Sequence, residues 1–431
     1  MARLLADHAA RFPDLVPGEL RTDHLDARDA ALAHAIADAV VRRWLTLSHL
    51  LDLVLKQPMR TLQPSLQGVL LSGAAQVLLL DRIPVHAAID ESVELAKAEL
   101  GRGAGGLANA VLRKVAAMRV PTRESGPWTG ERDRIPDSSG GCVRLADIML
   151  PEDDLERVSV ATSHSRWLLE RWRREHPAEW RSLALHSLVP PPTVLNTRHV
   201  SAPLPGTLVQ HEKPGSHVFV GPYSELRTLL RDRDDLWVQD ASSSLAVEAV
   251  AGLRPSLVID ACAGQGTKTR HLAAVFPGAE VIATDIDEGR FRVLREVYAD
   301  HPRVRVVPRE SLLEFAGRAD LVLLDVPCGN SGVLARRPEA KYRASNSQLK
   351  RLTGIQRQII ADSIPLLRQS PRGKVLYSTC SIEPEENGEM IAWAAKWHRF
   401  TVEHQQLTLP GGLPGEDAVG YRDGAFSAVL G

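Results

Sequence analysis

Two of the four cysteines in this chain of 431 residues stand directly after apolar runs. Cys328 follows "ADLVLLDVP" and Cys380 follows "GKVLYST". Each run predicts a buried strand, and open α/β sheets bind ligands at the carboxyl ends of their strands. Asp325 closes the first run. We therefore expect both thiols and the Asp325 carboxyl group to face one cleft.

A thiol, a carboxyl group and a methyl donor together suit covalent methylation of a pyrimidine. C5 of a pyrimidine is a weak nucleophile, but a thiolate that adds to C6 enables C5 to attack a sulfonium methyl group. The helix expected in "SIEPEEN", directly after Cys380, can activate that thiol through its dipole. A base must leave its stack to reach a buried thiol. Spacing alone does not decide which thiol is the nucleophile.

The small-residue loop "ACAGQGTK", residues 261–268, follows another apolar run, "SLVID". Gly264 and Gly266 permit a tight turn and a close approach to a ligand. Asp285 follows the next expected strand, where an acid can bond the two hydroxyls of a ribose. The loop is not G-x-G-x-x-G, and no G-x-x-x-x-G-K-[ST] is present. This pattern favours S-adenosylmethionine (SAM), and an ordinary βα turn with a capping Asp is the alternative.

The elements that must position these residues follow from the apolar periodicity. From residue 236 to 431, short apolar runs alternate with helical stretches, which predicts a Rossmann-like, mainly parallel, doubly wound sheet. Residues 1–118 have apolar residues at the helical period and predict an all-helical bundle.

Between these regions, residues 119–154 are rich in Pro, Gly, Ser and charge, which predicts a linker or an ordered surface loop. Residues 155–235 read as a small mixed α/β subdomain. Its Trp167, Trp172 and Trp180 lie among arginines and can contact RNA, although inward packing fits the composition better.

The overall composition excludes several classes of protein. The formal net charge is −1, so any RNA must be bound by local basic groups such as Arg42, Arg43 and Arg113. The four cysteines form no C-x-x-C pair, so we expect neither zinc nor a disulfide framework. No run of about eighteen apolar residues exists, and no membrane span is expected. We expect a cytoplasmic monomer without metal.

These motifs resemble the RNA 5-methylcytosine methyltransferases, and within them the bacterial 16S ribosomal RNA enzymes of the RsmB (Sun/Fmu) group. "DVPCGNSGVLARRPEAKYR" is similar to their Pro-Cys motif, "LYSTCSIEPEEN" to their Thr-Cys motif and "DACAGQGTKTRH" to their SAM loop. "LDRIPVHAAIDESVELAK" and "LANAVLRK" resemble the NusB-type helical RNA-binding domain of these enzymes. The resemblance covers nearly the whole chain except residues 119–150.

The resemblance implies SAM-dependent C5-methylation of a cytosine in RNA, with 16S ribosomal RNA as the first expectation. It makes Cys380 the nucleophile and gives Cys328 a role in product release. Asp325 would face the base, and Lys341 would lie near the site. The residues expected to hold SAM are Cys262, Ala263, Gly264, Gln265, Gly266, Thr267, Lys268, Asp285, Ser311 and Asp325.

The chain departs from the family pattern at three places. The SAM loop reads "CAGQGTK" where Cys-Ala-Ala-Pro-Gly-Gly-Lys is usual. "GNSG" follows Cys328 where Ser-Gly-Thr-Gly or Ser-Ala-Thr-Gly is usual, and Ser311 or Glu310 falls near the place of an acid on the adenine side. The alternative functions are a DNA cytosine methyltransferase that uses Cys328 as nucleophile, a non-enzymatic RNA-binding scaffold and a methyltransferase of another RNA.

Overall fold

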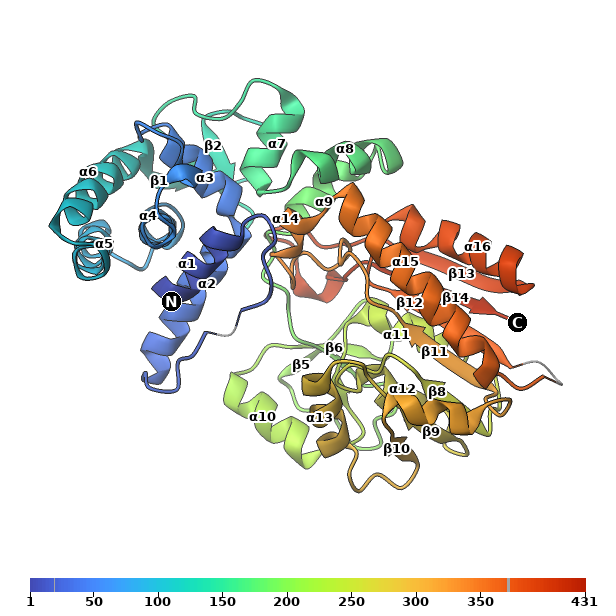
Figure 1. Cartoon of the computed structure of the whole chain (residues 1–431). Helices are drawn as coiled ribbons and strands as arrows, with labels where there is room; N and C mark the ends of the chain where they lie inside the picture. Colours follow the sequence, from blue (N-terminus) through green and yellow to red (C-terminus); the bar gives the residue numbers. More distant parts are fainter. Residues whose placement is uncertain (19, 370–372) are drawn as a thin grey trace. The chain divides into compact units, whose positions relative to one another are not determined.

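The computed structural model describes residues 1–18, 20–369 and 373–431, and it divides the chain into two compact units (Figure 1). The first unit consists of residues 1–190, 334–345 and 413–416. The second unit consists of residues 191–333, 346–412 and 417–431. Each unit therefore combines segments that lie far apart in the sequence.

The first unit begins with a helical region, which confirms the prediction from apolar periodicity. Its elements are α1 (Ala2–Arg11), α2 (Ala27–Arg42), α3 (Trp44–Asp52), the 3-10 helix η1 (Met59–Thr61), α4 (Pro64–Leu79), α5 (Val85–Leu100) and α6 (Arg102–Met118). Asp26 caps α2, because its carboxylate accepts hydrogen bonds from the N–H groups of Arg28 and Asp29 at 2.9 and 2.8 Å. Pro64 begins α4, where its missing N–H has no partner to lose.

A small antiparallel sheet follows, in the segment 119–154 for which a linker was predicted. Its strands are β1 (Arg119–Glu124), β2 (Arg134–Pro136) and β3 (Cys142–Leu145), in the order β1-β3-β2. Arg119 and Arg123 of β1 form ion pairs with Asp81 of the helical region. Charged residues thus attach this segment to the helices, which is why its composition resembles that of a linker.

Further helices complete the first unit, and one of them comes from much later in the sequence. They are α7 (Asp154–Thr162), α8 (Arg166–Glu175), α9 (Trp180–His186) and α14 (Ala340–Arg343). Trp172 and Trp180 are buried, in the inward packing that the composition favours over RNA contact. Because α7 packs against α3 and β2, the division into units differs from the predicted domains 1–118 and 155–235.

Two arginines that were expected to contact RNA are buried in the first unit, and that expectation was wrong for them. Arg42 donates hydrogen bonds to the carbonyl oxygens of Ser187 and Ala335, at 2.9 and 2.8 Å. Arg43 donates to a main-chain carbonyl oxygen 2.7 Å away. A buried guanidinium needs such acceptors for its five N–H groups. Arg113, in contrast, is exposed.

The second unit begins with a four-stranded antiparallel sheet in the order β5-β6-β4-β7. Its elements are β4 (Val194–Asn196), β5 (Leu208–Gln210), β6 (Ser216–Phe219), α10 (Tyr223–Asp232) and β7 (Trp237–Val238). Prolines before Val194 disfavour a helix there, and the chain forms the strand β4 instead. Leu195, Leu208, Leu226 and Leu236 make a small separate core.

A seven-stranded sheet lies at the centre of the second unit, in the order β10-β9-β8-β11-β12-β14-β13 (Figure 1). Its strands are β8 (Leu257–Asp260), β9 (Glu280–Ala283), β10 (Val304–Val306), β11 (Leu321–Asp325), β12 (Lys374–Thr379), β13 (Val402–Thr408) and β14 (Ala425–Leu430). Strands β8 to β12 are parallel, whereas β14 pairs antiparallel with β12 and β13. The predicted mainly parallel sheet is confirmed.

Helices cover both faces of this sheet, as expected of a doubly wound fold. They are α11 (Ala241–Glu248), α12 (Thr267–Val275), α13 (Glu288–Val297), α15 (Asn346–Ser363) and α16 (Gly388–His398), with the 3-10 helices η2 (Arg309–Phe315), η3 (Ile364–Leu366), η4 (Pro384–Glu386) and η5 (Ala418–Gly420). Because side chains alternate along a strand, Val258 joins the core with α11, α12 and α13, whereas Ile259 joins the core with α15 and α16. Burial on both faces leaves the strand ends as the place for a site.

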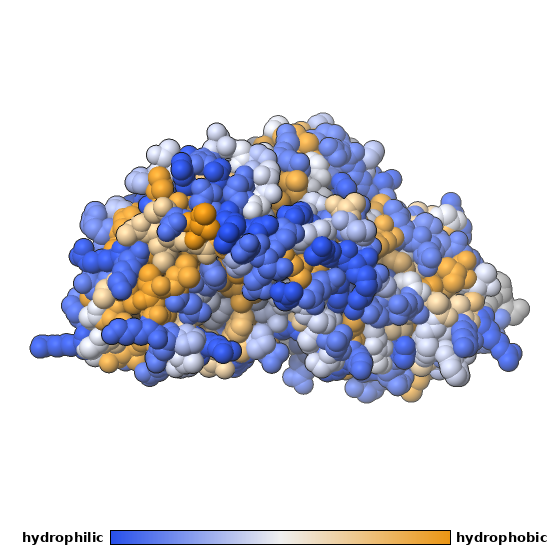
Figure 2. All heavy atoms as spheres, turned by 90° about the horizontal axis from the view of Figure 1, so that it is seen from above, coloured by the Kyte–Doolittle hydropathy of each residue, from blue (hydrophilic) through white to orange (hydrophobic). Residues whose placement is uncertain are grey.

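Figure 2 shows hydrophilic residues over most of the face that it draws, with patches of apolar residues between them. Within the residues that the structure describes, no helix combines the length and the apolar character needed to cross a membrane.

Candidate functional site

The carboxyl ends of neighbouring parallel strands gather most of the expected site residues at one edge of the sheet. Strand β8 ends at Asp260 and leads into the loop 261–268, and Asp285 follows β9. Strand β11 ends at Asp325, and Cys380 follows β12 directly. Because β9, β8, β11 and β12 are adjacent and parallel, these residues share the same edge.

An ion pair joins helix α12, after the loop, to the end of β11. The Nζ atom of Lys268 lies 2.8 Å from Oδ2 of Asp325. Burial lowers the pKa of the Lys268 ammonium, but the Asp325 carboxylate, together with the charges of Cys380 and Asp260, raises it by more, and the resulting pKa is above the ordinary value. Lys268 therefore stays protonated and balances the charge of Asp325.

Asp285 fixes the conformation of the small-residue loop. Its Oδ2 accepts a hydrogen bond from the N–H of Gly264 at 2.8 Å, and its Oδ1 accepts one from the N–H of Asp287 at 2.9 Å. Gly264 and Gly266 have φ values of 58° and 93°, in the left-handed region. A Cβ on Gly266 would lie 2.5 Å from a ring carbon of Tyr298. Position 266 therefore requires glycine.

The other residues expected to bind the cofactor lie in the same loop or in η2. Cys262 and Ala263 are partly buried, whereas Gln265 and Thr267 are exposed. Burial and the neighbouring carboxylates raise the pKa of the Cys262 thiol, so it keeps its proton. Ser311 is partly buried in η2.

Asp260, at the end of β8, is a buried acid to which the sequence analysis assigned no role. Its Oδ2 accepts a hydrogen bond from the Thr269 hydroxyl at 2.7 Å, and its Oδ1 has no partner among the described residues. Burial raises the pKa of Asp260 to about 7, and the charge of Asp325 adds to this effect. An acid that closes an apolar strand is visible in the sequence, but its burial is not.

The two thiols are in contact. The Sγ atoms of Cys328 and Cys380 lie 3.1 Å apart, with Cys328 buried and Cys380 partly exposed. The pKa of Cys328 lies well above its ordinary value, because of its hydrogen bond with Cys380, its burial and the charges of Cys380 and Glu386. When one thiol of the pair ionises, Cys328 is therefore the one that keeps its proton.

A buried carboxyl group, that of Glu386, holds the loop after β11. Its two oxygens accept the N–H of Gly329 at 3.0 and 3.1 Å, and Oε1 also accepts the side-chain amide of Gln356 at 2.9 Å. The same amide donates to the carbonyl oxygen of Pro327 at 3.0 Å. Burial raises the pKa of Glu386. These bonds fix the main chain on both sides of Cys328, and the motif "PEEN" is their only signal in the sequence.

A second set of hydrogen bonds ties this loop to the residues after β12. The N–H of Gly332 donates to the carbonyl oxygen of Cys380 at 2.9 Å, and the N–H of Ile382 donates to the Ser331 hydroxyl at 3.0 Å. The segments that carry the two thiols are therefore fixed to each other through their main chains.

Lys341 lies in the first unit, whereas the other expected site residues lie in the second. Lys341 lies in α14 of the first unit, fully buried, and its Nζ donates to the carbonyl oxygens of Arg42 and Thr162, both at 3.2 Å. Burial, with the charges of nearby arginines, places the pKa of this amine well below its ordinary value. Among the described residues, its contacts support the fold of the first unit.

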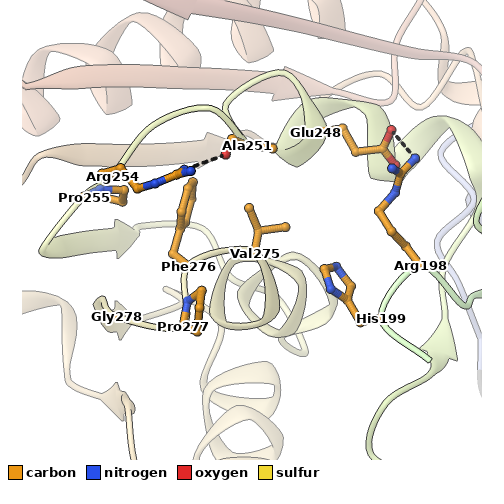
Figure 3. A pocket seen from close by; sticks show the side chains of 10 residues that line it. All are labelled: Arg198, His199, Glu248, Ala251, Arg254, Pro255, Val275, Phe276, Pro277 and Gly278. Carbon is orange, nitrogen blue, oxygen red and sulfur yellow. Dashed lines mark hydrogen bonds and ion pairs between the residues drawn. The ribbon is translucent and has the colours of Figure 1, made fainter. Parts of the chain in front are cut away.

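A cavity of about 800 Å³ lies at the opposite, amino-terminal edge of the parallel strands (Figure 3). It is lined by Arg198, His199, Glu248, Ala251, Arg254, Pro255, Val275, Phe276, Pro277 and Gly278. Arg198 is paired with Glu248 at 3.2 Å, and Arg254 donates to the carbonyl oxygen of Ala251 at 3.4 Å. None of the expected site residues lines this cavity.

Comparison with known families gives two matches. Residues 251–412 match the family described as 16S rRNA methyltransferase RsmB/F. Residues 6–117 match the NusB family. The first match contains both thiols, Asp325 and the loop at 261–268, and the second covers the helical region of the first unit.

Curated relatives align over most of the chain. The chain is 26% identical over 439 residues to the probable ribosomal RNA small subunit methyltransferase B of Bacillus subtilis (strain 168), which covers 96% of this chain and 90% of that protein. It is 28% identical over 409 residues to the ribosomal RNA small subunit methyltransferase B of Erwinia tasmaniensis, which covers 89% of this chain and 86% of that protein.

Solved structures share the fold. The crystal structure of PH0851 has a TM-score of 0.70 and 20% sequence identity, and the match covers 100% of this chain and 98% of that one. A methyltransferase homolog protein from Pyrococcus horikoshii has a TM-score of 0.52 and 21% identity, and the match covers 65% of this chain and 99% of that one.

Proposed function

We propose that this protein methylates C5 of a cytosine in 16S ribosomal RNA. The proposal follows from the family matches: residues 251–412 belong to the RsmB/F family of 16S rRNA methyltransferases, and residues 6–117 belong to the NusB family. The methyl donor in this proposal is SAM. The observation that carries the proposal is the contact of two thiols at 3.1 Å, of which Cys328 keeps its proton. Such a pair suits a reaction that attaches an enzyme thiol to a base and then releases it.

Cys380 is the nucleophile in this mechanism, because it is the more exposed thiol and its partner stays protonated. Its thiolate adds to C6 of the cytosine, and the electrons of the C5–C6 double bond move to C5. C5 then takes the methyl group and afterwards loses its proton to water. The double bond re-forms as Cys380 leaves as a thiolate, and the S–H group of Cys328 stabilises that thiolate by a hydrogen bond.

Asp325 faces the base, and Lys268 balances its charge across 2.8 Å. The carboxylate accepts a hydrogen bond from a proton that the cytosine takes up at N3, and this proton offsets the negative charge that builds on the ring when the thiolate adds. We give Lys341 a structural role in this proposal, because its Nζ donates to main-chain carbonyl oxygens in the first unit.

The residues of the cofactor loop fit SAM, which supplies an electrophilic methyl group when it is bound. The left-handed glycines of the loop 262–268 place main chain without bulky side chains at the carboxyl edge of β8. The carboxylate of Asp285 accepts two N–H groups and keeps acceptor capacity for the hydroxyls of a ribose. We place Ser311 on the adenine side of the cofactor.

The test is methyl transfer from tritiated SAM to 16S ribosomal RNA isolated from a strain that lacks this enzyme. We expect the label in 5-methylcytidine after nuclease digestion, with bisulfite sequencing to name the position. Label in a transfer RNA only, or in DNA only, would replace the proposed substrate. A chain that binds this RNA but shows no heat of SAM binding in calorimetry would be an RNA-binding scaffold.

A further inference from the structure

Asn330 lies between the two segments that carry the thiols. Its Nδ2 donates a hydrogen bond to the carbonyl oxygen of Cys328 at 3.1 Å, and its Oδ1 lies 3.2 Å from Sγ of Cys380. Its φ of 60° falls in the left-handed region, which asparagine adopts more readily than most residues. It also belongs to "GNSG", where the chain departs from the usual Pro-Cys motif, at a place where that motif has Gly or Ala.

The carbonyl oxygen of Cys328 decides which end of the Asn330 amide faces Cys380. A carbonyl oxygen only accepts hydrogen bonds, so the NH₂ end of the amide must point toward it. The amide oxygen is then left beside Cys380, and this oxygen is also an acceptor only. Their contact at 3.2 Å therefore requires that Cys380 supply the proton.

Other groups around Cys380 act on the same thiol. The S–H of Cys328 reaches Sγ of Cys380 from the loop after β11, and the Lys268 ammonium of α12 interacts with a charge on Cys380; both favour a thiolate. Two carboxylates lie in the same part of the site: Asp325 at the end of β11, paired with Lys268, and Glu386 in η4, whose charge acts on Cys328. The Oδ1 atom of Asn330, in contrast, is a neutral oxygen acceptor that faces the Cys380 thiol directly.

We propose that Asn330 is a positioning residue that keeps Cys380 in its protonated thiol form until the RNA base enters the site. The proton then passes to water, and the free thiolate attacks the base. The role of Cys380 as nucleophile rests on the proposed function, whereas the hydrogen bond to Asn330 does not. Because the thiolate is the reactive form of a cysteine, a resting thiol is shielded from alkylation and oxidation between turnovers.

The rate at which iodoacetamide alkylates Cys380 tests this proposal in the full chain, without RNA or SAM. Mass spectrometry of the Cys380 peptide gives the rate between pH 6 and pH 9. Asn330→Gly fits the left-handed backbone and removes the acceptor, so we expect about threefold to tenfold faster alkylation at neutral pH. Asn330→Asp replaces the acceptor by an anion, so we expect at least about tenfold slower alkylation.

Two controls separate this effect from a change in net charge and from unfolding. Asn346→Asp adds the same charge at an exposed position of α15 and should change the rate by less than about twofold. Cys142 is buried in the first unit, and its alkylation would report unfolding. Rates that change in the same direction in both Asn330 variants, or that do not change, would overturn the proposal. A chain that passes this test and fails to methylate RNA would overturn the proposed function alone.

Discussion

The cofactor side and the thiol side of the sheet edge are held in place by different means. On the cofactor side, Gly264 is bonded to Asp285, 21 residues later, and glycines allow the loop to turn. On the thiol side, Gly329 is bonded to Glu386, 57 residues later, inside a buried network with Gln356. The cofactor side depends on the conformation of a short loop. The thiol side depends on buried side chains whose hydrogen bonds cannot be replaced by hydrogen bonds to water.

The two sides also differ in how fully a buried carboxyl group is hydrogen-bonded. Glu386 accepts N–H groups on both oxygens, whereas Asp260 accepts one hydroxyl on Oδ2 and nothing described on Oδ1. A buried polar group is costly unless it is hydrogen-bonded. Conversion of each acid to its amide should therefore change stability in opposite directions.

Glu386→Gln should cause the largest loss, about 3 kcal/mol in the free energy of unfolding, because its NH₂ group would face the N–H of Gly329 in either orientation of the amide, and the Gln356 amide as well in one of them. Urea unfolding measures the change. Glu389→Gln, at an exposed position of α16, is the matched control and should change stability by about 0.5 kcal/mol or less. Equal effects of the two substitutions would mean that Glu386 does not hold the thiol loop.

Asp260→Asn should stabilise the protein, by about 2 kcal/mol at pH 8. The pKa of Asp260 is about 7 in the folded protein against an ordinary value of 3.8. Between these pH values the folded state binds more protons than the unfolded chain, so the native protein loses stability as the pH rises. Asparagine does not ionise, and the advantage of the variant should grow from about pH 4 to pH 7 and then level off. Urea unfolding at pH 5, 6 and 8 checks this; an advantage independent of pH would contradict the burial argument.

Asp285→Ala should weaken SAM binding by about 1–2 kcal/mol, roughly 5- to 30-fold in Kd, because ribose hydroxyls would lose their acceptor. Ser311→Ala should weaken it less. Calorimetric titration of both variants gives the comparison. Asp285→Asn retains an acceptor for the N–H of Gly264, and it separates the loss of ribose contact from disorder of the loop. A larger loss at Ser311 would place the cofactor mainly against η2.

The sequence predicts the cofactor side better than the thiol side for a physical reason. Apolar runs and glycines are local signals, and β8 to β12 formed where those runs predicted strands. The positions of Cys328 and Cys380 after two such strands also follow from local patterns. The partners of Glu386 and Asn330 do not, because a contact across 50 or more residues leaves no trace in periodicity.

The burial of basic residues and the strands in the charged segment 119–154 also could not be predicted from the sequence. Arg42 and Lys341 are charged residue types that usually lie at the surface, but in the first unit both are buried and donate hydrogen bonds to main-chain carbonyl oxygens. Arg119 and Arg123 of the segment 119–154 form ion pairs with Asp81 of the helical region. Composition records that a residue is charged, and only the fold supplies the partner that permits its burial.

The central claim, that Cys380 attacks the base and Cys328 helps to release it, is tested most directly by one denaturing gel. Each full-length variant is incubated with labelled substrate RNA and SAM, and the shifted, covalent RNA–protein band is measured. Cys328→Ala keeps the nucleophile but loses the S–H group 3.1 Å away, so it should accumulate the adduct. Cys380→Ala should bind RNA and form no adduct. An adduct in Cys380→Ala, or in neither variant, would contradict the assignment of the two thiols.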